Sequence, residues 1–127
     1  SEMCIRDRAS IIECYTENDV LIIGAGDDEF YPDNYIVVSR FDDGDVDGSI
    51  GIQTNISEVE VPNAIVKVCL RKNKLVFFIK ESRVQQVQFS KVEIYFTDDC
   101  TVDVPTLEKY IHDIFVFSST VVNIDLD

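Results

Sequence analysis

Three aspartates in this chain are spaced like the first ligands of a calcium-binding loop. Asp43, Asp45 and Asp47 would take positions one, three and five of such a loop, and Gly48 would take position six. Carboxylate oxygens suit a hard cation, but the loop also needs a bidentate glutamate at position twelve, where this chain has Thr54. Because that ligand is missing, we expect a solvated acidic loop without a metal, and the three aspartates remain a calcium candidate only.

Residues that catalyse acid–base or nucleophilic reactions are scarce. The one histidine, His112, stands on the polar side of a predicted helix beside Asp113. No serine or cysteine has a sequence neighbour that would activate it as a nucleophile. Gly24 and Gly26 lack the third glycine of a dinucleotide-binding turn, and acids follow them where a phosphate needs a helix N-terminus. We therefore predict that the protein is not an enzyme and uses no cofactor.

Carboxylates are interleaved with aromatic residues between Asp27 and Tyr35, in a connection that joins two apolar runs. Aromatic side chains anchor protein interfaces, and acids steer basic partners toward them. The alternative is that Phe30 and Tyr35 belong to the core and that only the acids are exposed. We predict that this connection and the acidic loop after Phe41 bind a protein partner. The residues assigned to this surface are Asp27, Asp28, Glu29, Tyr31, Asp33, Asp42, Asp43, Asp45 and Asp47.

Charge is distributed unevenly along the chain, whose net charge is −13. Residues 9–60 carry thirteen acids and one base, a net of −12, whereas residues 61–90 carry six bases and one acid, a net of +5. An acidic protein repels nucleic acid and attracts basic proteins, so we expect a basic protein partner and no nucleic acid. The basic segment offers an alternative, an anion-binding site formed by Lys67, Arg71, Lys72 and Lys74.

The pattern of apolar residues predicts that strands position most of these groups. Runs typical of strands cover residues 10–15, 20–25, 35–41, 50–55, 64–70, 75–80 and 92–96. In the run 64–70, alternation places Val66, Val68 and Leu70 on the core face and Lys67, Cys69 and Arg71 on the other. Residues 81–90 are polar and glutamine-rich and predict a loop or a short helical turn.

After Pro105 the period becomes helical. Leu107, Tyr110, Ile111, Ile114 and Phe115 recur at the spacing of one helix face. These patterns predict an α+β fold: a mostly antiparallel β-sheet of about six to seven strands with one C-terminal amphipathic helix packed on it.

The first eight residues, SEMCIRDR, match the translation of a transposase-based sequencing adapter, so we expect them to be foreign. Residues 9–127 are then a single domain, in which residues 118–127 add a strand or trail as an acidic tail. The other cysteines are widely spaced and form no C-x-x-C pair, which favours reduced thiols. No apolar run reaches the length of a membrane span, so we expect a cytoplasmic protein without membrane contact, whose oligomeric state the sequence leaves open.

Residues 20–40, VLIIGAGDDEFYPDNYIVVSR, resemble the bacterial immunity-protein family numbered ten, whose members are antidotes to polymorphic toxins. In that pattern a hydrophobic strand leads into acids and aromatics, a second strand ends in an arginine, here Arg40, and a hairpin, a strand and a final helix follow. The resemblance implies an inhibitor that binds and neutralises a cognate toxin, such as a basic nuclease. The alternative is a small-molecule or nucleotide-binding protein, for example a phage-encoded sponge that sequesters a host defence signal with the basic residues 67–83.

Overall fold

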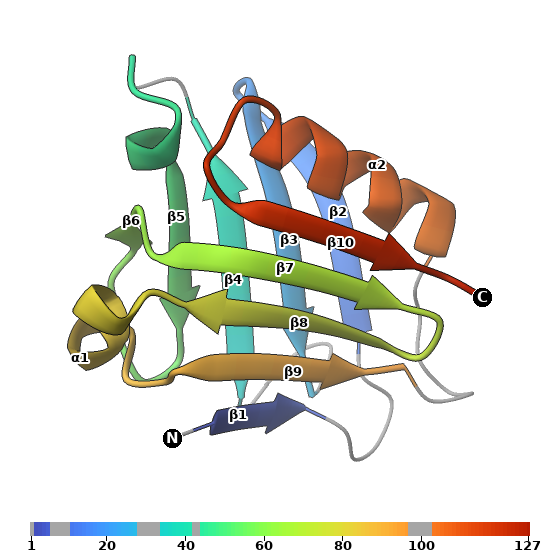
Figure 1. The fold of residues 1–127 in the computed structure, drawn as a ribbon, viewed down its shortest axis with the longest axis horizontal. Helices are drawn as coiled ribbons and strands as arrows, with labels where there is room; N and C mark the ends of the chain where they lie inside the picture. Colours follow the sequence, from blue (N-terminus) through green and yellow to red (C-terminus); the bar gives the residue numbers. More distant parts are fainter. Residues whose placement is uncertain (1, 6–10, 28–33, 42–43, 97–102) are drawn as a thin grey trace.

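The computed structural model describes residues 2–5, 11–27, 34–41, 44–96 and 103–127. Within these residues the chain forms two five-stranded β-sheets, one long helix and one short one (Figure 1). The first sheet contains β2 (Ile11–Glu17), β3 (Val20–Gly26), β4 (Tyr35–Arg40), β5 (Ile50–Thr54) and β6 (Val61–Pro62). The second sheet contains β1 (Glu2–Ile5), β7 (Ile65–Arg71), β8 (Lys74–Ile79), β9 (Lys91–Tyr95) and β10 (Val121–Asp125).

The first sheet is an antiparallel meander in which each strand pairs with the next along the chain. Only Asn18 and Asp19 join β2 to β3, and both residues have a positive φ, 52° and 66°. Two-residue turns of this kind match the twist of the strands and favour Asn and Asp, so the predicted strands 10–15 and 20–25 are confirmed and form a hairpin. Because Leu21 pairs with Arg40, this turn lies at the same end of the sheet as Arg40.

The second sheet has an antiparallel centre and parallel edges. β7, β8 and β9 pair in antiparallel fashion, and Lys72 and Asn73 form the turn between β7 and β8. The edge strands β1 and β10 pair in parallel with β9 and β7. β10 is thus the added strand, one of the two alternatives expected for residues 118–127. β1 comes from the segment that the sequence attributes to an adapter.

The prediction that Val66 faces the core is wrong. The register of β7 against β8 shifts between Ile65 and Lys67, so Val66 is an extra residue without a partner opposite it. Its side chain is 44% exposed, and Ile65 takes its place on the buried side. Beyond this bulge the alternation is as predicted, because Val68 and Leu70 are fully buried.

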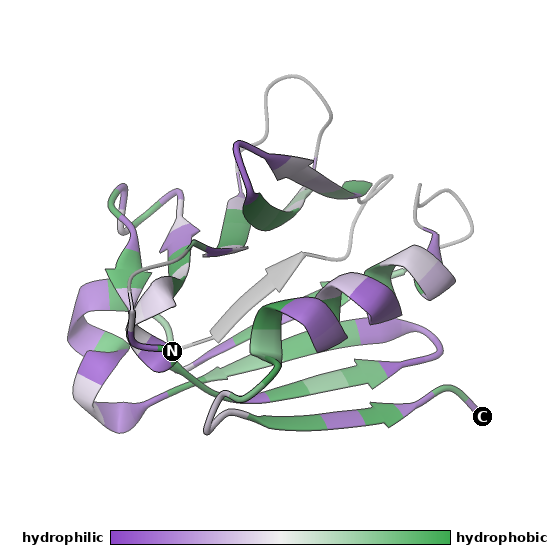
Figure 2. Cartoon of the chain, turned by 90° about the horizontal axis from the view of Figure 1, so that it is seen from above, coloured by the Kyte–Doolittle hydropathy of each residue, from purple (hydrophilic) through white to green (hydrophobic). Residues whose placement is uncertain are grey.

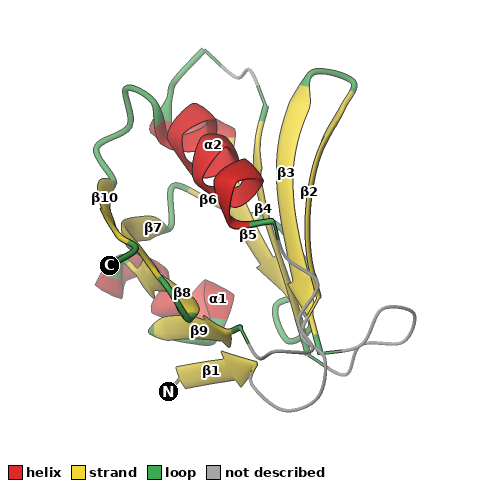
Figure 3. Ribbon diagram, turned by 90° about the vertical axis from the view of Figure 1, so that its right-hand side faces the viewer, coloured by secondary structure: helices red, strands yellow, loops and turns green. Residues whose placement is uncertain are grey.

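The two sheets face each other, and the strands of one run across those of the other (Figures 1 and 3). Their facing sides form one core, to which both sheets contribute alternating apolar residues. Burial of each large aliphatic or aromatic side chain contributes about 1.5–3 kcal/mol to folding. The largest fully buried side chains are Phe77, Ile23, Ile36, Ile52, Leu70, Leu75, Ile94, Leu107, Ile111, Ile114 and Val38.

Helix α2 (Val104–Phe115) closes one side of the space between the sheets, next to β10 of one sheet and to β2 and β3 of the other (Figure 3). Asp103 precedes it and Pro105 lies in its first turn, a position where a missing backbone N–H does no harm. The predicted apolar stripe is confirmed, since Leu107, Ile111 and Ile114 are fully buried. In Figure 2 the side of α2 that faces the viewer is largely hydrophilic, whereas the strands below it are largely hydrophobic.

The α+β class with mostly antiparallel strands is confirmed, but the predicted single sheet of six to seven strands is wrong. The described residues form ten strands in two sheets, because residues 11–62 build one layer and residues 65–125, joined by β1 at the edge, build the other. The helix packs at the side of a two-sheet core rather than over one open sheet. Residues 81–90 hold a 3₁₀ turn (Glu81–Arg83) and the short helix α1 (Val84–Val87), as one of the two alternatives for this segment predicts.

Candidate functional site

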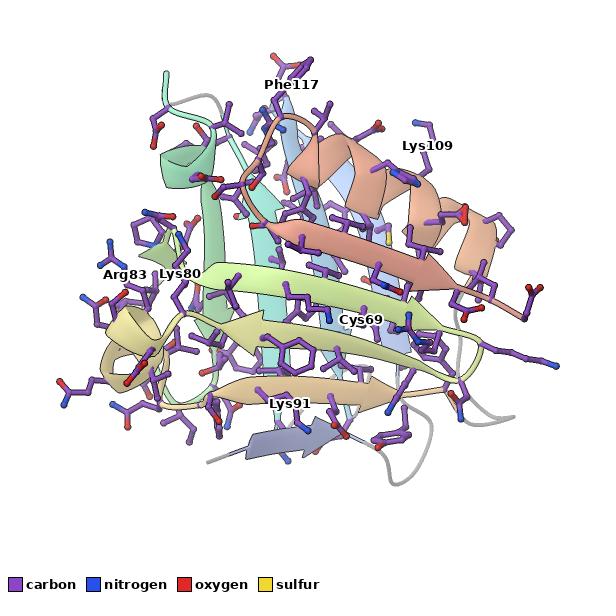
Figure 4. The ribbon with its side chains drawn as sticks, in the orientation of Figure 1. Cys69, Lys80, Arg83, Lys91, Lys109 and Phe117 are labelled. Atoms are coloured by element: carbon purple, nitrogen blue, oxygen red, sulfur yellow. The ribbon has the colours of Figure 1, made fainter. Side chains whose placement is uncertain are left out.

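An exposed phenylalanine stands at the turn between α2 and β10. The ring of Phe117 is 90% exposed and points outward at the end of the molecule (Figure 4). The backbone of Phe117 has a φ of 63°, in the left-handed region that large side chains rarely adopt. Val116 beside it is 44% exposed. The turn therefore presents two adjacent apolar side chains to solvent, one of them on a strained residue.

Asp47 binds the two serines that follow Phe117 in this turn. Its Oδ1 accepts hydrogen bonds from Ser118 Oγ at 2.5 Å and from the Ser119 amide at 3.1 Å, and its Oδ2 accepts one from Ser119 Oγ at 2.6 Å. These donors favour the ionised carboxylate, so the Ser118 and Ser119 hydroxyls hold the pKa of Asp47 below its ordinary value. Thr120 Oγ1 also donates to the Ile65 carbonyl at 2.7 Å, which anchors the start of β10.

Arg40 binds the backbone that precedes Phe117. Its Nη1 donates to the carbonyl oxygens of Val116 at 2.8 Å, Ile114 at 2.9 Å and Asp113 at 3.3 Å. Carbonyls at a helix C-terminus lack partners within the helix and carry a partial negative charge, so a guanidinium satisfies both needs. Arg40, the last residue of β4, thus caps α2 and fixes the residue that precedes Phe117.

A shallow cavity of about 230 Å³ adjoins this cap. Its polar lining includes three carboxylates from three elements: Asp19 from the β2–β3 turn, Asp45 from the loop after β4, and Asp113 from α2. Phe117 lies in sequence between Val116, which bonds Arg40, and Ser118, which bonds Asp47. We call Val116, Phe117, Asp19, Asp45, Asp47 and Asp113 the Phe117 surface.

The structure separates the acids that the sequence assigned to one surface. Asp27 follows β3, and Gly26 pairs with Tyr35 at one end of β4, whereas Asp45 and Asp47 follow the other end of β4. The six residues of β4 span about 20 Å. Asp27 closes its own loop, because its carboxylate accepts hydrogen bonds from the Asn34 side chain at 3.0 Å and from the Asn34 amide. Asp28, Glu29, Tyr31, Asp33, Asp42 and Asp43 lie outside the described residues.

The calcium-loop spacing does not fold as a calcium loop. Asp47–Ser49 forms a 3₁₀ turn and the next residues enter β5, where Thr54, at position twelve, is fully buried. Asp45 Oδ2 accepts a hydrogen bond from the Gly48 amide at 2.9 Å, and Asp47 turns to the two serines. The two described carboxylates therefore serve different protein donors. In the described part of the chain no three His, Cys, Asp or Glu side chains come together as a metal site.

The alternative anion site falls on the β7–β8 hairpin. Lys67, Arg71 and Lys74 share the face of the second sheet that points away from the core, and Lys72 lies in the turn. Lys80 and Arg83 lie beside α1, away from that turn (Figure 4). They are bound there by Asn63 and Gln86. The hairpin thus gathers the four cations of the predicted anion site, whereas Lys80 and Arg83 lie apart from it.

The described histidine and cysteines show no sign of activation. His112 is exposed on α2, as predicted. Cys14 and Cys69 are free thiols, and burial, with a smaller contribution from Asp103, raises the pKa of Cys14 to about 11. At neutral pH the Cys14 thiol is therefore protonated, and thiols in that form are poor nucleophiles.

Sequence reasoning missed Phe117 and the roles of Arg40 and Asp113. A signal for Phe117 was present: Val116 and Phe117 are two large apolar residues directly after the predicted stripe ends at Phe115, next to the polar residues Ser118, Ser119 and Thr120. The bond from Arg40 to α2 joins residues more than 70 positions apart, and no local pattern predicts it.

Comparison of the chain with protein-family models, with curated proteins and with solved structures gave no match. Among the helices of the described residues, none is both long and apolar enough to cross a membrane.

Proposed function

We propose that this protein is an immunity protein, which binds and neutralises a basic toxin domain, such as a nuclease, through the Phe117 surface. The observation that carries the proposal is Phe117, a large ring exposed on a left-handed residue and held from both sides by Arg40 and Asp47. Exposure of the ring and the left-handed backbone both cost free energy in the monomer. Such local strain is typical of functional sites.

The surroundings of the ring indicate the chemistry of the partner. Buried aromatic anchors dominate the binding energy of protein interfaces, and surrounding charges set the association rate and the choice of partner. Here the cavity beside the Arg40 cap is lined by three carboxylates and by Arg40 itself, whose guanidinium is bound to backbone carbonyls. Asp113 also pairs with Lys109, so the surface is acidic on balance. The complementary partner offers an apolar pocket ringed by lysines and arginines. In a nuclease such a basic surface receives substrate phosphates, and acids bound there block the substrate.

This proposal centres the interface on Phe117 rather than on Tyr31. The acids of the loop after β4 stay in the interface, because Asp45 and Asp47 belong to the Phe117 surface. Asp27, at the other end of β4, enters the interface only with a partner that spans about 20 Å.

The test pairs this protein with the C-terminal domain encoded directly upstream of its gene, where the resemblance places a toxin. Co-expression should restore growth, and the purified proteins should bind. Phe117→Ala should weaken binding at least about 25-fold, the effect of losing a hot spot of about 2 kcal/mol. Asp19→Lys combined with Asp113→Lys should lower the association rate and its dependence on salt.

Two controls separate binding from folding. Phe117→Gly relieves the left-handed strain, so it should raise the free energy of unfolding by about 1 kcal/mol while binding is lost. Glu13→Lys combined with Glu81→Lys makes the same charge change at exposed acids elsewhere and should leave binding intact. Wild-type affinity in Phe117→Ala, or failure of the wild-type protein to bind and protect, would refute the proposal.

A further inference from the structure

The outer face of the second sheet carries cations and aromatic rings side by side. Lys67 and Arg71 come from β7, Lys74 and Phe78 from β8, and Tyr95 from β9. Their neighbours along each strand, such as Val68, Leu75 and Ile94, point the other way into the core. Figures 1 and 3 show this face without another described element in front of it.

The cations and rings form two matching pairs across neighbouring strands. Lys67 lies opposite Phe78, with its Nζ 5.8 Å from the ring centroid. Lys74 lies opposite Tyr95, with its Nζ also 5.8 Å from the ring centroid. Because Lys74 and Phe78 are four residues apart on β8, the two pairs repeat at about 13 Å. Each pair joins a positive charge to a flat apolar surface.

The described acid in the middle of this face is already paired. Glu93 accepts a hydrogen bond from Tyr95 Oη at 2.7 Å and forms an ion pair with Lys91 at 2.8 Å. Lys91 and then Tyr95 hold the pKa of Glu93 below its ordinary value. Glu93 therefore fixes the phenol of Tyr95 and is balanced by Lys91, with a smaller attraction to Lys74. Asp125 of β10 lies beside Arg71 at the edge of the same face. The face thus carries four cations, Lys67, Arg71, Lys74 and Lys91, against the two described acids Glu93 and Asp125.

The structure also separates this face from many of the described acids. Those of residues 9–60 lie on the first sheet and its connections, on the other side of the core: Glu13, Glu17, Asp19, Asp27, Asp45, Asp47, Glu58 and Glu60. Packed sheets lie about 10 Å apart, and salt screens exposed charges beyond about 8 Å at physiological ionic strength. The net charge of −13 predicts no nucleic-acid partner for the chain as a whole, but it does not describe this face.

We propose that the outer face of the second sheet binds single-stranded nucleic acid. Phosphates contact Lys67, Arg71 and Lys74, with Lys72 at the hairpin turn, and bases stack on Phe78 and Tyr95. Sheets bind single strands in this way, with aromatic platforms for bases and cations for the backbone. A repeated pair on an open pleated face suits a repeating polymer, whereas sites for free nucleotides are concave and enclose their ligand. None of these residues belongs to the Phe117 surface, so this inference is independent of the proposed function.

The test measures fluorescence anisotropy of a labelled twelve-nucleotide uridine RNA at 25–200 mM salt. The wild-type protein should bind at low salt, and the logarithm of its affinity should fall with the logarithm of salt at a slope of about −2 to −3, as for three to four phosphate contacts. Lys67→Gln combined with Lys74→Gln should weaken binding about tenfold or more and flatten that slope. Phe78→Leu and Tyr95→Leu should each weaken binding about fivefold with little change of slope.

Lys109→Gln is the matched control, because Lys109 is an exposed lysine on α2 at another side of the molecule (Figure 4). It should bind as the wild type does. Melting midpoints of all variants show whether a loss of binding reflects unfolding. Phe78→Leu and Tyr95→Leu are separate proteins, so the test of the rings stands even if one of them does not fold.

Competition identifies the ligand. Unlabelled uridine RNA should displace the probe, whereas uridine monophosphate at the same nucleotide concentration, polyglutamate and inorganic polyphosphate should compete at least about tenfold less well. Equal competition by the monophosphate would overturn the single-strand assignment, and equal competition by polyglutamate or polyphosphate would overturn the role of the rings. Absence of binding at 25 mM salt, or an equal loss in Lys109→Gln, would overturn the proposal entirely.

Discussion

Asp47 connects two parts of the chain that are 71 residues apart. Both of its carboxylate oxygens accept hydrogen bonds from the serines that follow Phe117. An ionised acceptor forms stronger hydrogen bonds than a neutral one, so the charge of Asp47 is part of what fixes this turn. The sequence placed Asp47 in an acidic loop that meets solvent or a partner, and only the tertiary fold brings the serines to it.

Replacing this carboxylate should therefore destabilise the fold. Asp47→Asn removes one acceptor and the charge, so we expect a loss of about 1–2 kcal/mol in the free energy of unfolding at pH 7, measured by urea denaturation. Glu13→Gln, at an exposed site on β2, is the matched control and should change stability by less than about 0.5 kcal/mol.

The wild type and Asp47→Asn should also differ in how their stability depends on pH. Because the pKa of Asp47 is lower in the folded protein, the unfolded chain takes up the proton first as pH falls. The wild-type advantage over Asp47→Asn should stay constant between pH 7 and pH 5 and shrink below about pH 4, the ordinary range of an aspartate. An advantage at pH 3 as large as that at pH 7 would contradict this assignment.

At the scale of elements, Arg40 links the first sheet to α2. Arg40 is the last residue of β4, and its Nη1 donates hydrogen bonds to three carbonyl oxygens around the end of the helix. The helix would otherwise leave these acceptors to water, at the point where the chain turns sharply to Phe117. One side chain thus sets the position of the helix end and the direction of the turn.

Removal of this cap should be measurable. Arg40→Gln should lower the free energy of unfolding by about 1–2 kcal/mol, because it removes a cation at a helix C-terminus and hydrogen bonds to three carbonyls. Lys109→Gln removes an exposed i, i+4 ion pair with Asp113 at 3.4 Å and should change stability by less than about 0.5 kcal/mol. Equal effects of the two substitutions in urea denaturation would show that Arg40 does not act as a cap.

Local patterns predicted most elements because their signals are local. The strands of both hairpins and the stripe of α2 follow from alternation and from helical period. The bulge at Val66 escaped prediction because a single inserted residue leaves no trace in composition, and strict alternation then assigns the wrong face. The Phe117 surface escaped because Asp19, Asp45 and Asp113 come from three elements that only packing brings together.

At the scale of the whole molecule, the fold sorts charge onto different sides. The hairpin cations share the outer face of the second sheet, while Asp19, Asp45 and Asp113 meet at the end of the first sheet. The sequence showed which segments are charged, yet it offered no means to count sheets. Alternation describes one strand at a time and does not say whether strands far apart in the chain share a layer.

Residues 1–8 permit a direct test of the domain boundary. Their strand, β1, is an edge strand that pairs with β9, and the core that the structure describes runs from Ile12 to Phe115. If this segment is foreign, a chain that starts at Ala9 should keep cooperative unfolding, and its melting midpoint should fall by less than about 4 °C, which corresponds to about 1 kcal/mol. A larger fall would assign residues 1–8 to the native domain.

The order of the strands also determines what emerges first from the ribosome. The whole first sheet lies within residues 11–62, and each of its strands pairs with a neighbour already synthesised. Its apolar side, however, is covered only by elements made later: first β7, β8 and β9, which end at residue 95, and then α2 and β10, which end at residue 125. A nascent chain therefore carries a complete but uncovered first sheet, a state prone to aggregation, until the second sheet and α2 follow.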